Sequence, residues 1–180
     1  MMQRIVHALL TPQGANACRS TRENLMYALL KLSSAMTLLG AVAIPAQAQT
    51  CAGRVGGGAV QLVVVATEMR SKAGEVAFTI YPDNKSRFLA KGGKLLRARV
   101  AAQRPETRAC FWLPPGHYAL AQYHDENGDH DFNRTLFAPK EGFGFSNDAP
   151  TSVGLPSFAA TRFALPAGGT TIRARMRYRR

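Results

Sequence analysis

The stretch "TRACFWLPPGHYALAQYH", residues 107–124, decides the fold of this protein. Two strand-like runs, residues 107–113 and 117–124, flank the segment "PPG". Proline presets φ in such a segment and glycine accepts a positive φ, so a tight turn is expected there. Side chains that alternate between two faces with a period of two are typical of β-strands. The stretch therefore predicts two strands with a turn between them.

The same pattern continues on both sides of this stretch. In residues 75–81, Val76, Phe78 and Ile80 share one face, which is the spacing of a half-buried strand. Some seven short strands separated by turn residues predict an all-β protein, an antiparallel β-sandwich, with a small barrel as the alternative. The other runs that we expect to form strands are residues 59–68, 94–103, 157–165 and 171–178.

The N-terminal part of the chain is not expected to belong to this domain. Residues 32–44 form an apolar run that follows Lys31 and precedes the small-x-small pattern at residues 46–48. The run is shorter than the roughly 20 residues that span a membrane. We therefore expect residues 1–48 to be a signal peptide, with translation starting at Met26, and residues 49–180 to be one periplasmic or secreted domain. A leader that stays in the membrane is the alternative.

Cysteine usage fits export. Of the three cysteines, Cys18 lies in the expected signal peptide, which leaves Cys51 and Cys110. In an oxidising compartment such a pair usually forms a disulfide. A reactive thiol or a metal thiolate is the alternative, although no CxxC motif supports either.

The segment "HDENGDHDFN", residues 124–133, is acidic in a chain whose net charge is +12. Two carboxylates about 6 Å apart repel by roughly 3 kcal/mol at an effective dielectric near 20, so their clustering has to be offset. Calcium binds six to eight oxygens, which loops supply at alternate positions. Side chains with oxygen occupy every odd position of this loop, which predicts a calcium site formed by Asp125, Asn127, Asp129, Asp131 and Asn133.

The loop departs from an EF-hand in its second half. The sixth position, which is normally glycine, is His130, and the twelfth, which is normally a bidentate Glu, is Leu136. We expect Phe132 to plug the loop into the core. Alternatively, the Asp and Asn side chains only cap turns and bind no metal. The candidates for a missing ligand are Glu126, Glu141 and Asp148.

Three ordered motifs carry a family resemblance: "LPPGHYALAQYHDENGDHDFN", "PKEGFGFSNDAP" and "PSFAATRF". From about Gln61 to Met176 the chain resembles an exported bacterial family catalogued as domain of unknown function (DUF) 2141. The resemblance implies an immunoglobulin-like or transthyretin-like sandwich and no assigned activity. It also implies glycine where this chain has His130.

The sequence offers no convincing catalytic constellation. His117 and His124 are seven residues apart on one expected strand and so face opposite ways. Ser146 lacks the GxSxG context of an activated serine. The residues between His124 and Ser157 do not alternate, and we expect them to form a packed aromatic cap that covers the core or binds a ligand. We therefore expect a binding or envelope-associated module without catalysis, with a metal-dependent hydrolase using the acidic loop as the alternative.

Cationic side chains recur on one face of the last expected strand, and Arg97 and Arg99 would extend the same surface. They form a solvated strand edge or a contact for an anionic polymer or another protein of the envelope. Nucleic acid is not an expected partner, because the single Trp112, which we place in the core, gives no stacking platform. The residues of this face are Arg173, Arg175, Arg177 and Arg179.

Overall fold

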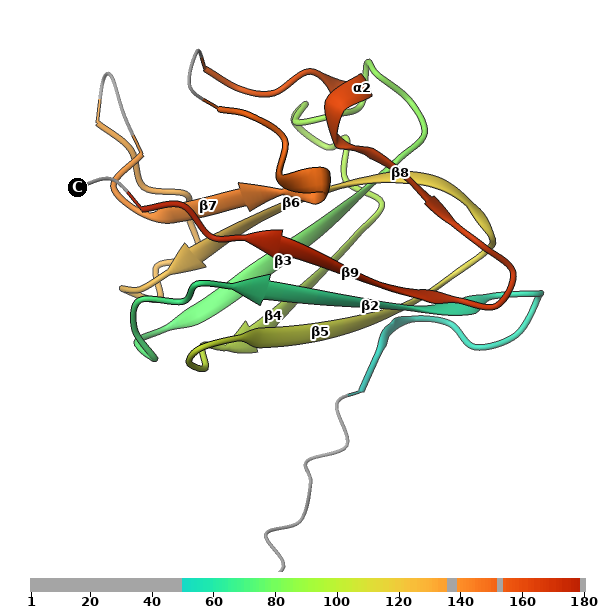
Figure 1. Ribbon diagram of the computed structural model, residues 1–180, viewed down its shortest axis with the longest axis horizontal. Coiled ribbons are helices and arrows are strands. Elements are labelled where there is room, and N and C mark those ends of the chain that lie inside the picture. The colour runs from blue at the N-terminus through green and yellow to red at the C-terminus, as the bar shows by residue number, and fades with distance from the viewer. Residues whose placement is uncertain (1–49, 136–138, 152–153, 179–180) are drawn as a thin grey trace, which may run out of the picture. The chain divides into compact units, whose positions relative to one another are not determined.

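The computed structural model describes residues 50–135, 139–151 and 154–178. In these residues the strands form two sheets that lie face to face and do not close into a barrel (Figure 1). The first sheet has the order β1 (Ala52–Gly53), β5 (Thr107–Leu113), β2 (Val60–Thr67), β9 (Thr170–Arg175). The second has the order β4 (Leu96–Ala101), β3 (Glu75–Pro82), β6 (Gly116–Asp125), β7 (Gly142–Phe145), and β8 (Arg162–Leu165) also pairs with β6.

The core lies between the sheets and is built from the alternate positions that the sequence indicated. Val76, Phe78 and Ile80 of β3 are fully buried in it, and Phe111 of β5 faces them from the first sheet. On β4 the apolar positions face the core, whereas Arg97 and Arg99 lie on the outer face. The period-two pattern therefore assigned the faces of these strands correctly.

The "PPG" turn carries the chain from one sheet to the other. Residues 107–113 form β5 in the first sheet, and residues 116–125 form β6 in the second. The two strands therefore contribute opposite walls of one core, with Leu113 and Leu120 both in it. This crossing is what places the acidic segment at the far end of β6.

Pairing in the first sheet is not antiparallel throughout, which corrects the expected topology. β2 pairs with β5 antiparallel but with β9 parallel, and the short β1 pairs with β5 parallel. Between β2 and β9 the chain passes through the whole second sheet. The direction of β9 is therefore set by how it returns to the core and not by a hairpin turn.

Residues 157–165 do not form one strand as expected. Ser157 begins the short helix α2 (Phe158–Thr161), because its Oγ accepts a hydrogen bond from the Ala160 N–H at 3.2 Å. Serine at this position satisfies an N–H that the first turn leaves unpaired. Only the second half of the run, β8, enters the sheet.

A strand that the sequence analysis missed lies within the expected cap. β7 has the sequence "GFGF", in which glycine alternates with Phe143 and Phe145. A Cβ atom on Gly142 would collide with the Tyr178 ring, and one on Gly144 would collide with the Arg175 carbonyl oxygen. One face of β7 packs so closely against the C-terminal segment that only glycine fits on it. The alternation of glycine and phenylalanine was the available signal.

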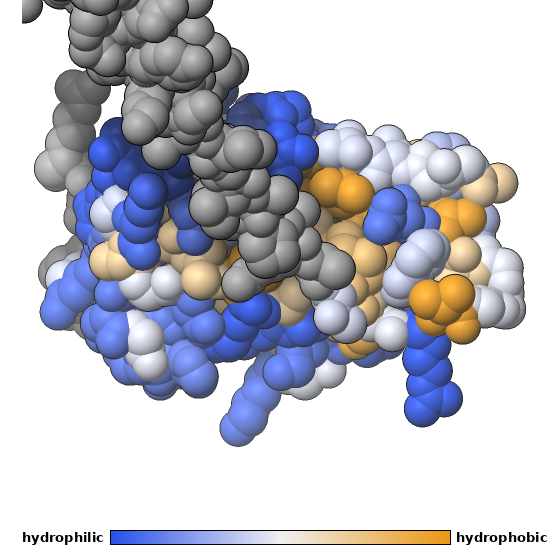
Figure 2. Space-filling model, turned by 90° about the horizontal axis from the view of Figure 1, so that it is seen from below, coloured by the Kyte–Doolittle hydropathy of each residue, from blue (hydrophilic) through white to orange (hydrophobic). Residues whose placement is uncertain are grey.

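The start of the described chain is tied to the first sheet by a disulfide between Cys51 and Cys110. Trp112, two residues further along β5, is half-buried and lies outside the core cluster, so its expected place in the core is wrong. It alternates away from Phe111 and Leu113, which do face the core. Figure 2, a view from below Figure 1, shows hydrophilic side chains gathered toward one end of the visible face and apolar ones toward the other.

Among the described residues, no helix is long and apolar enough to cross a membrane. The expected signal peptide at residues 1–48 lies outside the described residues.

Candidate functional site

The acidic segment leaves the end of β6 as a loop that its first carboxylate holds together. Asp125 is fully buried; its Oδ1 accepts a hydrogen bond from the Gly128 N–H at 2.7 Å and its Oδ2 one from the His130 N–H at 2.8 Å. A carboxylate that accepts main-chain hydrogen bonds in this way stabilises a tight turn. The turn-capping role that the sequence left open is therefore present at Asp125.

An arginine from β4 compensates the charge of this buried carboxylate. Arg99 Nη1 lies 3.2 Å from Asp125 Oδ2 and also donates to Glu75, while Nη2 donates to the His130 carbonyl oxygen at 2.7 Å and to Tyr123 Oη at 2.8 Å. Sequence reasoning missed this role, since it placed Arg99 on a cationic surface that is either solvated or in contact with an anionic polymer. The pattern could show that Arg99 faces outward but not which loop lies there.

Two of the three candidates for an additional metal ligand are engaged elsewhere. Arg70 and Ser71 both donate to the Glu126 carboxylate, and the hydrogen bond from Arg70 holds the pKa of that carboxyl below its usual range. Asp148 accepts from the Arg175 main-chain N–H at 2.7 Å, near β9. Glu141 is the remaining candidate.

Glu141 belongs to the acidic loop in space. Its Oε2 accepts a hydrogen bond from the Asn133 N–H at 3.0 Å. One carboxylate oxygen from each of Asp125, Asp129 and Glu141 lies within 4.8 Å of the other two. Burial, followed by repulsion from the carboxylates of the loop, raises the pKa of Glu141 even though the Asn133 N–H lowers it. No arginine, lysine or histidine pairs with Glu141 within the described ranges.

The other predicted ligands surround Asp129. Its Oδ2 accepts from the side-chain amides of Asn127 at 2.7 Å and Asn133 at 2.6 Å, and its Oδ1 accepts from the Asp131 N–H at 2.9 Å. These hydrogen bonds, the one from Asn133 first, hold the pKa of Asp129 below its usual range. Asp131 contributes through its main chain among the contacts of the described residues. The side chains of Asn127 and Asn133 thus contact Asp129, and an Asp125 oxygen lies within 4.8 Å of it, so four of the five predicted residues gather there through their side chains.

His130 occupies the sixth loop position with a φ of +68°. This is the left-handed conformation that glycine adopts without a Cβ clash. Its Nε2 lies 3.4 Å from Glu75 Oε1. Glu75, Asp125 and His130 form a second group of possible ligands, but Arg99 already pairs with both of its carboxylates.

Phe132 does not reach the core between the sheets, which corrects its expected role. Its ring packs on Tyr123 and Phe143, with centroids 5.5 and 6.1 Å away, on the outer face of the second sheet. Tyr123 alternates outward on β6, so the loop folds over the outside of the sheet. The core was already filled by the inner positions of both sheets.

The cationic face of the last strand is largely neutralised. Arg173 pairs with Glu106, and Arg175 lies 3.8 Å from Glu68 Oε1 and 3.6 Å from Asp148 Oδ2. Arg179 lies outside the described residues. Arg97 and Arg99 do not extend this surface along a sheet, because β4 and β9 are edge strands of different sheets. A binding role for the arginines of this face stays a prediction.

Together these features define a class of protein: a β-rich domain of two sheets, with a disulfide that ties its start to the first sheet and a carboxylate cluster at the end of β6. The chain belongs to a family of uncharacterized proteins conserved in bacteria (DUF2141), whose model matches residues 64–173. The matched range includes the whole acidic loop, and the family resemblance seen in the sequence is confirmed. No curated protein and no solved structure matches the chain.

Proposed function

We propose that this protein is an exported module, immunoglobulin-like or transthyretin-like in its sandwich, that acts by binding and not by catalysis. A calcium ion holds its acidic loop in the working conformation. The observation that carries the calcium proposal is the meeting of Asp125, Asp129 and Glu141, which are brought together from the two ends of one loop.

The charge of the cluster suits a divalent cation. Arg99 offsets the buried charge of Asp125, which leaves the carboxylates of Asp129 and Glu141 without a cationic side chain among the described residues. Two unpaired carboxylates with oxygens within 4.8 Å of each other repel strongly, and one divalent ion neutralises both charges. The loop, with its irregular backbone, suits the flexible oxygen coordination of calcium.

The remaining oxygens come from the same loop. The Asp131 carbonyl stands at the seventh position, where a main-chain oxygen commonly serves. Asn127 and Asn133 now direct their Nδ2 groups at Asp129. With an ion beside Asp129 each amide turns over, so that Oδ1 faces the ion in place of Nδ2.

The hydroxyl and imidazole groups that an enzyme would use have structural partners. Ser146 Oγ accepts from the Leu120 N–H at 3.0 Å and donates to the Thr161 carbonyl oxygen. His124 is fully buried, with its two ring nitrogens 2.8 Å from Tyr178 Oη and 2.7 Å from the Ala73 carbonyl oxygen. These contacts support a binding role. The Cys51–Cys110 disulfide supports an oxidising compartment and thus export.

Thermal unfolding with calcium and with a chelator tests the proposal. Calcium at a hundred times its dissociation constant should stabilise the wild-type protein by roughly 2.7 kcal/mol. Glu141→Gln should abolish most of this shift. The matched control is Glu126→Gln, because Glu126 lies in the same loop but pairs with Arg70, so this variant should keep the calcium shift from a lower starting temperature.

An unchanged melting temperature together with no heat in a calorimetric calcium titration of the wild-type protein would overturn the calcium site. A hydrolytic activity that requires a metal and disappears in Asp129→Ala would overturn the non-catalytic role in favour of the hydrolase.

A further inference from the structure

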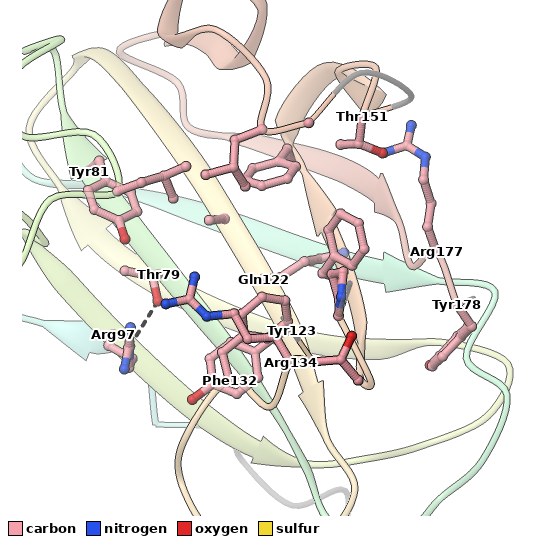
Figure 3. A pocket seen from close by; sticks show the side chains of 18 residues that line it. Thr79, Tyr81, Arg97, Gln122, Tyr123, Phe132, Arg134, Thr151, Arg177 and Tyr178 are labelled. Atoms are coloured by element: carbon pink, nitrogen blue, oxygen red, sulfur yellow. Dashed lines mark hydrogen bonds between the residues drawn. The ribbon is translucent and has the colours of Figure 1, made fainter. Parts of the chain in front are cut away.

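The outer face of the second sheet holds a cavity of about 800 Å³. Its floor is formed by outward positions of the strands, which include Tyr81 of β3, Arg97 of β4, Tyr123 of β6 and Phe143 of β7. The acidic loop contributes Phe132 as part of a wall. In Figure 3 the labelled side chains, Arg97, Tyr123 and Phe132 among them, come from different strands and loops and surround the cavity. A volume of this size accommodates a small organic molecule.

Aromatic rings give the cavity flat apolar walls. Phe132 lies between Tyr123 and Phe143, and Phe143 in turn packs edge-on against Phe145, with centroids 6.2 Å apart. Tyr123, Phe132 and Phe143 remain only half-buried, so part of each ring faces the cavity and not a neighbouring side chain. A planar apolar group can stack on such rings.

The charge of the cavity is one-sided. Arg97, Arg134 and Arg177 line it, and none of the described residues that line it is Asp or Glu. Arg97 donates to Thr79 Oγ1 at 2.8 Å and lies over the Tyr123 ring, 5.9 Å from its centroid. Arg177 donates to the carbonyl oxygens of Ala149 at 3.1 Å and Asp148 at 2.6 Å.

Several other arginines of the domain are neutralised, whereas no carboxylate pairs with these three among the described residues. Arg70, Arg99, Arg162 and Arg173 each pair with a carboxylate, as the cationic face of the last strand also shows. A guanidinium group keeps its charge at all physiological pH values and binds carboxylates and phosphates in a planar fork. Three such groups around one apolar cavity therefore provide a positive potential that no described acidic side chain within the cavity offsets.

We propose that this cavity binds a small organic anion with a flat, apolar body. Its anionic head pairs with Arg97 and Arg134, and its body lies against Phe132 and Phe143. Arg177, which lies across the cavity from Arg97 in Figure 3, adds to the attraction from the other side. The inference rests on the proposed binding function and gives it a ligand class, but it does not require the calcium ion.

A calorimetric titration of the exported protein with 2-naphthoate tests this assignment. We expect Arg97→Gln and Arg134→Gln each to weaken binding about tenfold, since each removes a charged hydrogen-bond donor. Phe132→Leu, which keeps an apolar side chain but removes the ring, should also weaken it. The matched control is Arg173→Gln, which removes an arginine that pairs with Glu106 outside the cavity, and it should bind as the wild type does.

The uncharged isostere 2-naphthamide separates the contribution of the anionic head from that of the apolar body. It should bind at least tenfold more weakly than 2-naphthoate. Equal binding of the two, equal binding by wild type and both arginine variants, or no binding of 2-naphthoate at millimolar concentration would each overturn the inference.

The calcium-dependent shift in melting temperature, measured on Arg97→Gln and Glu141→Gln, distinguishes failure of the anion-binding proposal from failure of the proposed calcium site. Arg97→Gln should keep the shift, because Arg97 makes no contact with the carboxylate cluster among those of the described residues. Glu141→Gln should lose the shift and still bind 2-naphthoate.

Discussion

Arg99 and Asp125 form an ion pair that reaches across β3, from β4 on one side to the end of β6 on the other. The carboxylate of Asp125 is fully buried, and Arg99 Nη1 lies 3.2 Å from its Oδ2. The same guanidinium donates to the His130 carbonyl oxygen, so one side chain both neutralises the start of the acidic loop and holds its middle. The loop therefore depends on a residue that lies 26 positions earlier in the sequence.

Replacing Arg99 should destabilise the protein far more than replacing its neighbour on the same face. Arg99→Met leaves a buried carboxylate without its cation, and we expect a loss of about 3 kcal/mol in the free energy of unfolding. Arg97→Met removes an exposed arginine whose hydrogen bond goes to a neutral hydroxyl, and should cost less than about 1 kcal/mol. Urea unfolding of both variants measures the difference, and equal losses would contradict the special role of Arg99.

The left-handed backbone at His130 should be relieved by glycine. Non-glycine residues in this region carry a steric cost of about 1 kcal/mol, so His130→Gly should be more stable than His130→Ala by up to about that amount. Both variants lose the contact with Glu75, which makes alanine the matched control for glycine. Chemical denaturation should rank glycine above alanine. The reverse order would mean that the loop does not hold this residue at a positive φ.

When calcium is absent, Glu141 and Asp129 should contribute to the stability of the protein with opposite dependence on pH. Burial raises the pKa of Glu141, so the folded state favours its protonated form; its stabilising contribution is complete below the unfolded pKa and is lost as the pH rises through the folded pKa. Glu141→Gln should therefore raise the melting temperature near pH 7 in chelator. This gain should vanish near pH 4, where the wild-type carboxyl is largely protonated.

Asp129 serves as the control for Glu141, because its pKa is shifted in the opposite direction. Its pKa is lowered by hydrogen bonds from Asn133, Asp131 and Asn127, so its contribution is present above the unfolded pKa and is lost as the pH falls through the folded pKa. Asp129→Asn should lower the melting temperature near pH 7 under the same conditions. Shifts of the same sign in the two variants would contradict the unequal environments of these carboxylates.

Removal of the disulfide should lower stability without changing the fold. The bond closes a loop with a sequence separation of 59 residues, for which chain entropy gives a loss of up to about 4 kcal/mol in the Cys51→Ala/Cys110→Ala variant. The wild-type protein should lose a comparable amount in a reducing agent, to which the double variant is insensitive. A melting temperature that a reducing agent leaves unchanged would show that the bond contributes nothing to stability.

Much of the second sheet could be predicted from alternation alone. Residues 75–82 and 116–125 form strands within two residues of the expected bounds, and their inner and outer faces are as the pattern indicated. The signal failed where a local interaction competed with it. Ser157 caps a helical turn at the start of an expected strand, and the glycines of β7 concealed a strand of which only two side chains are large.

The candidate site could be predicted in part. The odd-numbered oxygens of residues 125–133 were visible because they are local, and Glu141 was named as one of three candidates without a way to choose among them. The choice depended on Arg70 and on the Arg175 main chain, which engage Glu126 and Asp148. These partners lie far from the loop in sequence, and single-chain spacing does not show them.

By itself the sequence determined which residues form most strands, which face of each strand is buried, and where negative charge and cysteine gather, since alternation and composition are local properties of the chain. Only the tertiary structure decided that β5 and β6 lie in different sheets, that β9 runs parallel to β2, and that three arginines and three half-buried aromatic rings share one cavity. The physical reason is that alternation fixes the side to which a residue points but carries no information about the strand or loop that it meets there.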